Sequence, residues 1–205
     1  MKPNAERYES DQANGQYGEQ EQLFVQTINH LRHDWMNDVQ VLYGYLKMKK
    51  YDKMHDYMEI VKEKMLQENC ISKLGVPALI LYLQSFRVRC RWVRLDVELE
   101  SGFQLDMLPI DGRLVADTVI AVIETFVRKA VPNADGELNR ILLQMGVREH
   151  LLVIGFHYTG GYDRKGLKQE LVNMSLSCGI GRLIEGEATY EEDGAVVDIY
   201  MPLGT

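Results

Sequence analysis

Residues 23–50, LFVQTINHLRHDWMNDVQVLYGYLKMKK, decide the fold of the N-terminal part of this chain. Their apolar side chains recur at steps of three and four residues, the spacing that lines one face of an α-helix. These residues are Phe24, Ile28, Leu31, Trp35, Val39, Leu42 and Leu46. At about 100° per residue, polar side chains fall on the opposite side, His33 among them. The pattern predicts an amphipathic helix over about residues 21–49 that displays His33 to water.

The neighbours of His33 suit a nucleophilic imidazole. Asp34 can accept a hydrogen bond from Nδ1–H and thereby leave Nε2 as a free lone pair. Arg32 offers a cation to a transferred anion, and Asn37 lies one turn on along the same polar stripe. A histidine on a polar helix face is more often only a solvated side chain, so these neighbours carry the prediction. His30 lacks a following acid and is the weaker candidate.

A resemblance to a known family rests on this same helix. The run Leu31-Arg32-His33-Asp34-Trp35-Met36-Asn37, then VQVLYGYL over residues 39–46 and Tyr51-Asp52-Lys53, resembles the phospho-acceptor helix of the sporulation initiation phosphotransferase B family. It is also similar to the helix of sensor histidine kinases of the related alpha-helical type. The resemblance implies that His33 carries a phosphoryl group. In the mechanism that we expect, Asp34 orients the ring, and Arg32 and Asn37 contact the phosphoryl oxygens.

A docking surface is expected around His33. Met36, Gln40 and Gly44 lie on or beside the exposed stripe, and small or flexible side chains suit a partner that approaches closely. The alternative for these three residues is ordinary helix surface.

A second helix should begin after a short turn, with Asp52 as its N-cap. Two helices joined by so short a link fold back antiparallel, and the pair cannot cover both apolar stripes. We therefore expect a homodimer with a four-helix bundle; the alternative is packing against the C-terminal part of the chain. The predicted dimer core consists of Phe24, Ile28, Leu31, Trp35, Val39, Leu42, Met58 and Val61.

The bulk properties exclude several classes of protein. No apolar run reaches the roughly 18 residues of a membrane span, and the N-terminus is too polar for a secretory signal, so we expect a cytoplasmic protein. The net charge of −7 argues against a general nucleic-acid surface. Arg87, Arg89, Arg91 and Arg94 are expected at the solvated end of a helix that runs into a strand, or else as a phosphate-contacting patch. Cys70, Cys90 and Cys178 lack metal-ligand spacing and are expected as reduced thiols.

The rest of the chain predicts an α+β fold with a two-layer α/β sandwich. We expect residues 1–20 to be a disordered leader, 21–68 the helical hairpin, 69–76 a linker and 77–205 the α/β domain. The predicted helices of that domain span residues 78–89, 113–130 (with Asp111 as N-cap) and 165–175. The predicted strands or extended segments span residues 91–99, 105–109, 139–148, 150–158, 183–191 and 196–202.

The order of these C-terminal elements resembles the ATP-binding domain of histidine kinases, but the nucleotide-binding residues are altered. Arg128 and Lys129 stand where the kinase helix offers an acid and a magnesium-binding Asn. The run HYTGG at residues 157–161 has no carboxylate for the adenine amino group, and CGIGRL at 178–183 keeps only a glycine pair that is equally typical of a turn. The domain is therefore predicted to be degenerate, with no cofactor or metal held by this chain.

These features together predict a histidine phosphotransferase of a sporulation phosphorelay. His33 would accept a phosphoryl group from the aspartyl phosphate of one response regulator and pass it to a second, with Mg²⁺ supplied by the regulator. Two alternatives remain: a module that docks regulators or kinases without phosphotransfer, and an ATP-dependent sensor histidine kinase core.

Overall fold

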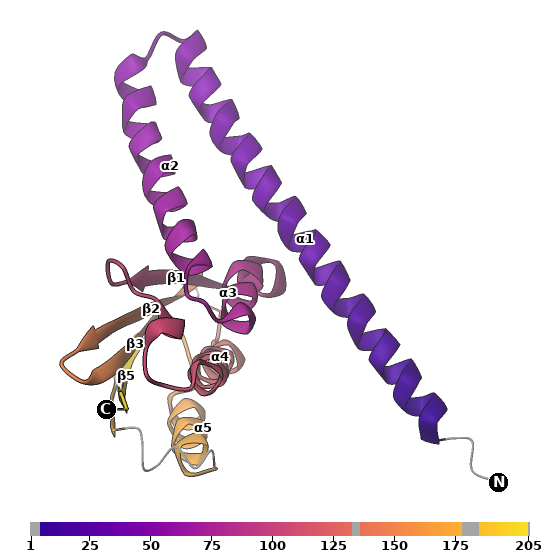
Figure 1. Cartoon of the computed structure of the whole chain (residues 1–205). Helices are drawn as coiled ribbons and strands as arrows, with labels where there is room; N and C mark the ends of the chain where they lie inside the picture. Colours follow the sequence, from indigo (N-terminus) through magenta and orange to yellow (C-terminus); the bar gives the residue numbers. More distant parts are fainter. Residues whose placement is uncertain (1–4, 133–135, 178–184, 205) are drawn as a thin grey trace. The chain divides into compact units, whose positions relative to one another are not determined.

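A computed structural model describes residues 5–132, 136–177 and 185–204 of the chain (Figure 1). The chain divides into two compact units, Met1–Lys62 and Glu63–Thr205. The division falls inside the second helix, a few residues before the predicted boundary at residue 68. We describe the two units separately.

The first unit is a helical hairpin. Helix α1 (Ala5–Lys47) is joined to α2 (Tyr51–Ser72) by a turn in which Lys49 has a φ of 55°. The predicted start of α1 near residue 21 differs from the structure, in which the helix already begins at Ala5. The added segment has no proline and contains three Glu, three Gln and two Ala, which favour a helix, whereas Gly15 and Gly18 disfavour one. It offers little to bury.

The limits of α2 also differ from the prediction. Asp52 lies in the first turn of α2 and is not its N-cap, and its charge still favours that end of the helix. Because α2 continues to Ser72, it takes up half of the segment predicted as a linker. Residues 1–4 of the predicted leader lie outside the described residues.

Contacts between the two helices lie near the turn. The Tyr57 hydroxyl donates a 2.9 Å hydrogen bond to Asp38 Oδ1, and the Tyr45 and Tyr57 rings meet edge to face at 6.2 Å. The Asp38 carboxylate raises the pKa of Tyr57 because it favours the protonated hydroxyl. This contact ties the C-terminal part of α1 to the first half of α2.

Most of the predicted dimer core is uncovered in the single chain. Trp35 is 52% exposed, Val39 57% and Met58 52%. Phe24 and Ile28 are also exposed, while Leu31, Leu42 and Val61 are half-buried. The hairpin alone thus leaves a long apolar surface in contact with water.

The second unit is a five-stranded mixed sheet with helices against one face (Figure 1). Its strands are β1 (Val93–Leu99), β2 (Asn139–Arg148), β3 (Leu151–Thr159), β4 (Glu185–Tyr190) and β5 (Gly194–Pro202), in the order β1-β2-β3-β5-β4. Only β1 and β2 pair in parallel. The helices are α3 (Pro77–Arg89), α4 (Gly112–Lys129) and α5 (Arg164–Ser177). The predicted α+β fold and two-layer sandwich are confirmed.

Alternation along the strands places one set of side chains in the core. Ile141, Leu143 and Met145 of β2 are buried, as are Ile154 and Phe156 of β3, and all of them belong to the core cluster that includes the buried residues of α4. The intervening residues face the opposite side of the sheet. The predicted bounds of β2 match the observed strand.

Helix α4 begins where the sequence predicts. The Asp111 carboxylate accepts hydrogen bonds from the backbone N–H groups of Arg113 and Leu114, at 2.9 and 3.4 Å. By contrast, the segment predicted as extended at 105–109 contains a short 3₁₀ helix, Leu105–Met107. The prediction was wrong there because burial of Leu105 and its N–H bond to the Leu74 carbonyl bend the segment into a turn.

The arginine cluster lies where α3 leads into β1, as predicted. Arg89 pairs with Glu124 at 3.4 Å and Arg94 with Asp96 at 3.0 Å. Cys70 and Cys90 are free thiols, and Cys178 lies outside the described residues. In the part of the chain that the structure describes, no helix has the length and apolar content needed to cross a membrane.

Candidate functional site

His33 is exposed on α1, and its closest polar partner is Asn37. The Asn37 side-chain amide lies 3.1 Å from Nδ1 of the ring, one helical turn away. Residues four apart share a helix face, which explains the contact. Within the described residues, Nε2 of His33 contacts no polar group. One ring nitrogen is therefore held by the protein, and the other is open to an approaching molecule.

The recorded ion-pair contact of Asp34 is with His30 and not with the predicted partner, the ring of His33. Its Oδ2 lies 3.8 Å from Nε2 of His30, the residue one turn before it. Successive residues of a helix point about 100° apart, so Asp34 shares a face with His30 rather than with His33. Both contacts, His30 with Asp34 and His33 with Asn37, join residues four apart. Helical spacing alone could therefore have predicted them.

Arg32 lies beside His33 in sequence but is engaged elsewhere. Its Nη2 donates a 3.2 Å hydrogen bond to Asn29 Oδ1 on the exposed surface. An exposed neutral partner of this kind contributes little, and the long side chain can leave it at small cost. The structure does not bring Arg32 to the imidazole.

The orientation of the Asn37 amide decides the tautomer of His33. With the amide nitrogen toward the ring, it donates to Nδ1 and the ring proton resides on Nε2. A half-turn of the amide exchanges oxygen and nitrogen in nearly the same positions. Nδ1–H then donates to Oδ1, and Nε2 carries a free lone pair. The site can thus present a nucleophilic nitrogen.

The surface that continues from His33 along α1 is unobstructed. Met36 is 52% exposed, and Gln40 is also exposed. A Cβ built at Gly44 would meet nothing within 4 Å, so Gly44 is not required for packing in this chain. The three predicted docking residues therefore lie on open surface.

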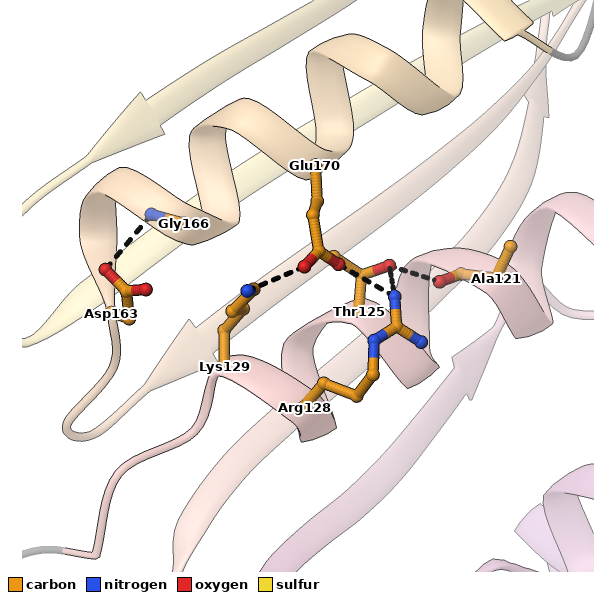
Figure 2. A network of polar contacts seen from close by, with 7 residues as sticks. All are labelled: Ala121, Thr125, Arg128, Lys129, Asp163, Gly166 and Glu170. Carbon is orange, nitrogen blue, oxygen red and sulfur yellow. Dashed lines mark hydrogen bonds and ion pairs between the residues drawn. The ribbon is translucent and has the colours of Figure 1, made fainter.

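In the second unit, the end of α4 is closed by an ion-pair cluster. Figure 2 shows Glu170 of α5 between Lys129 and Arg128 of α4, at 2.6 and 2.8 Å. Arg128 also donates to the Thr125 hydroxyl at 3.0 Å. Hydrogen bonds from Lys129 and then Arg128 lower the pKa of Glu170. Arg128 and Lys129, which the sequence predicts at the positions of the kinase acid and Asn, thus pair with a carboxylate of the chain itself. No local sequence pattern reveals this contact.

Tyr158, in the HYTGG run that has no carboxylate, packs into the core of the second unit. Its ring stacks on Phe126 of α4 at 5.3 Å with an interplanar angle of 9°, and its hydroxyl donates to the Gly161 carbonyl at 2.7 Å. Burial raises the pKa of Tyr158. An aromatic side chain fills this region of the core. The glycine pair at 178–183 lies outside the described residues.

Metal ligands are not gathered in this chain as far as it is described. Over residues 5–132, 136–177 and 185–204, no three His, Cys, Asp or Glu side chains are placed to hold a metal ion together.

Sequence comparison finds a family model that matches the helical hairpin. Residues 16–74 match the family model described as the Sensor_kinase_SpoOB-type, alpha-helical domain. A curated relative, Sporulation initiation phosphotransferase B of Bacillus subtilis (strain 168), is 29% identical over 90 residues, which are 44% of this chain and 46% of the relative. The match thus spans about half the length of that relative. The resemblance predicted from the His33 helix is confirmed.

Comparison with solved structures finds histidine kinases at low identity and with TM-scores below 0.5. The histidine kinase AdeS of Acinetobacter baumannii is 12% identical with a TM-score of 0.46, over 84% of this chain and 98% of that one. The histidine kinase ThkA in complex with the response regulator TrrA is 14% identical with a TM-score of 0.43, over 99% and 68% of the two chains.

Proposed function

We propose that this chain is a histidine phosphotransferase of a sporulation phosphorelay and that His33 is its phospho-acceptor. The observation that carries the proposal is the exposed His33 ring, with Nδ1 against Asn37 and Nε2 open. The match of the hairpin to the SpoOB-type domain and the printed name of the relative support it.

The transfer step needs alignment more than bond activation. The Nε2 lone pair attacks the phosphorus of an aspartyl phosphate on a response regulator, an N–P bond forms, and the P–O bond to the aspartate breaks and leaves a carboxylate. The imidazolium that develops is stabilised by Nδ1–H donating to Asn37 Oδ1. A second regulator reverses the step with its own aspartate. Both species are high-energy, so the exchange is near balance.

The same geometry suggests roles for the other predicted site residues. Asn37 acts as a positioning residue for the ring, which replaces its predicted contact with the phosphoryl oxygens. Arg32 leaves Asn29 and donates instead to a phosphoryl oxygen. The new hydrogen bond joins two charged groups and is therefore stronger than the bond to the neutral amide. Magnesium comes with the acidic pocket of the regulator. Met36, Gln40 and Gly44 lie under the docked regulator.

A homodimer completes the proposed site. The exposed apolar stripe of the hairpin, with Trp35, Val39 and Met58 each more than half exposed, favours a second copy that pairs around a two-fold axis. Four helices then enclose the stripes and leave His33 on the outside of the bundle.

The proposed activity does not use ATP. Two features support this part of the proposal: Glu170 occupies Arg128 and Lys129, and the Tyr158 ring stacks on Phe126. Phosphoryl transfer from ATP needs its metal and its phosphate clamp together. The alternatives are an ATP-dependent kinase core, which would label itself from ATP, and a docking module, which would bind regulators without becoming labelled.

The test uses the purified chain and a response regulator phosphorylated on aspartate. We expect acid-labile, base-stable label on the wild type and on His30→Gln, and none on His33→Gln. Radioactive ATP alone should leave the wild type unlabelled. Label that persists in His33→Gln would overturn the assignment of the acceptor, and label from ATP would overturn the exclusion of a kinase.

A further inference from the structure

The face of the sheet away from the helices contains a hollow of about 630 Å³. It lies across β1, β2, β3 and β5, and it is separate from both regions discussed above. Its floor is formed at Gly146 of β2 and Gly155 of β3, where outward-facing side chains are missing. These two glycines are diagonal neighbours, because Gly155 pairs with Gln144 and Gly146 with Val153.

The hollow exists because these two positions are glycine. A Cβ built at Gly155 would lie 3.0 Å from Asp198 Oδ1, and one at Gly146 would lie 2.8 Å from Glu100 Oε2. Neither glycine has a positive φ, so the backbone does not require glycine at either place. A methyl group at either position would take up part of the space.

Carboxylates line two opposite sides of the hollow. Glu98 and Glu100 lie on the β1 side and Asp198 lies on β5, whereas Arg148 is the one guanidinium in the lining and His157 its one imidazole. Glu98 accepts a 2.7 Å hydrogen bond from Gln144, and Glu100 accepts a 2.9 Å bond from the Val147 N–H. With His157 neutral, three carboxylates against one guanidinium leave two negative charges.

Asp198 is the carboxylate that most needs a partner. It is half-buried, and among the described residues no group donates to it or forms an ion pair with it. A half-buried carboxylate without a partner loses hydration without compensation. A cationic group that entered the hollow beside Gly155 would restore that interaction.

The spacing of the carboxylates indicates the shape of the cation. Glu98 and Asp198 lie in one row of the sheet, since Glu98 pairs with Gln144, Gln144 with Gly155 and Gly155 with Asp198. Three strand spacings separate them by about 14 Å at the backbone. One compact ion cannot reach both sides. In the neighbouring row, Val153 of β3 pairs with Tyr200 of β5, and both offer apolar surface beside the carboxylate row. An aromatic ring also attracts ammonium groups.

We propose that this hollow binds a free linear aliphatic polyamine. One ammonium group pairs with Asp198 beside the Tyr200 ring, a second pairs with Glu98 and Glu100, and the methylene chain crosses Gly155 beside Val153. A divalent metal does not fit the same residues, because the described part of the chain has no converging set of metal ligands. This site is independent of His33 and of the proposed phosphotransfer.

Titration of the full chain with spermidine, followed by calorimetry and by amide NMR shifts, tests the proposal. We expect the backbone amides of Gly146, Gly155 and Asp198 to shift on binding. Glu98→Gln combined with Asp198→Asn should weaken binding at least tenfold. Glu192→Gln, which removes one carboxylate in the turn between β4 and β5, should bind like the wild type.

Two further experiments distinguish binding in the hollow from general attraction between the acidic chain and a cation. Gly155→Ala leaves the charge unchanged but narrows the hollow, and it should weaken binding severalfold; a thermal melt checks that the variant folds. N-acetylated spermidine, which has lost one terminal charge, should bind more weakly than spermidine. Equal binding by the wild type and the double variant, or an absence of shifts at Gly146 and Gly155, would overturn the proposal.

Discussion

Single hydrogen bonds decide the chemistry that the His33 helix can perform. The carboxylate next to the histidine in sequence contacts His30, and the amide one turn on contacts the ring of His33. The pentapeptide at residues 33–37 therefore contains the proposed acceptor and its proposed positioning residue at its two ends. An amide is well suited to this position because it can either donate to Nδ1 or accept from it.

Removal of that amide should slow transfer without destroying the acceptor. We expect Asn37→Ala to reduce the rate of phosphoryl transfer to His33 about tenfold, which corresponds to about 1.4 kcal/mol, the scale of one hydrogen bond. Single-turnover transfer from a phosphorylated regulator measures the rate, and ¹⁵N shifts of the ring report the tautomer. Asn29→Ala, an equivalent loss one turn before His33, is the control and should leave the tautomer unchanged. An unchanged tautomer in Asn37→Ala would contradict the positioning role.

At the scale of elements, caps and helix pairs hold the second unit together. Asp111 receives two backbone N–H groups at the start of α4, and Glu170 receives two cations from its end. The Asp111 cap joins residues two and three positions apart in sequence, whereas the Glu170 ion pairs join α5 to α4. They should differ in how they respond to pH and in how much stability they provide.

Loss of the cap should destabilise α4 and the unit that packs on it. We expect Asp111→Ala to lower the free energy of unfolding by about 1 kcal/mol, because an alanine leaves the first N–H groups of the helix without acceptors. Urea denaturation followed by circular dichroism measures the change. Asp111→Asn keeps an acceptor oxygen and should recover most of the loss. If alanine and asparagine behave alike, the cap contributes nothing.

The contribution of Glu170 should disappear in acid. Its pKa is lowered in the folded chain, so the carboxylate stabilises the fold at pH values above its unfolded pKa, and this stabilisation is lost as the pH falls through the folded pKa. Glu170→Gln should therefore unfold at lower urea than the wild type near pH 7. The difference should shrink below about pH 4, near the ordinary pKa of glutamate. Glu192→Gln serves as the control, and a difference that persists unchanged in acid would contradict the ion-pair account.

At the scale of the whole molecule, the uncovered stripe of the hairpin predicts the oligomeric state. Light scattering after size exclusion should give twice the chain mass of 23.6 kDa. Val39→Glu would bury a charge between helices and should yield monomers, whereas Gln40→Glu on the polar stripe should remain dimeric. If the wild type is a monomer at micromolar concentration, the prediction of a dimeric four-helix bundle is wrong. The apolar stripe would then be expected to pack on the chain's own second unit.

Local patterns of sequence determined much of this protein. Helical periodicity predicted the paired helices, alternation predicted the bounds of β2, and Asp111 was identified as a cap, because each depends on residues within a turn or two of one another. The run RHDWMN likewise indicated the resemblance that the family model later matched. The early start of α1 at Ala5 was missed, since a polar segment that favours a helix shows no apolar period.

Only the tertiary structure decided the contacts between distant residues. Glu170 meets Arg128 and Lys129 across two helices, Tyr158 stacks on Phe126, and Gly146 and Gly155 open one hollow between two carboxylate groups. No spacing along the chain encodes these neighbours. They arise from strand register and helix packing, which depend on the burial of the whole core at once.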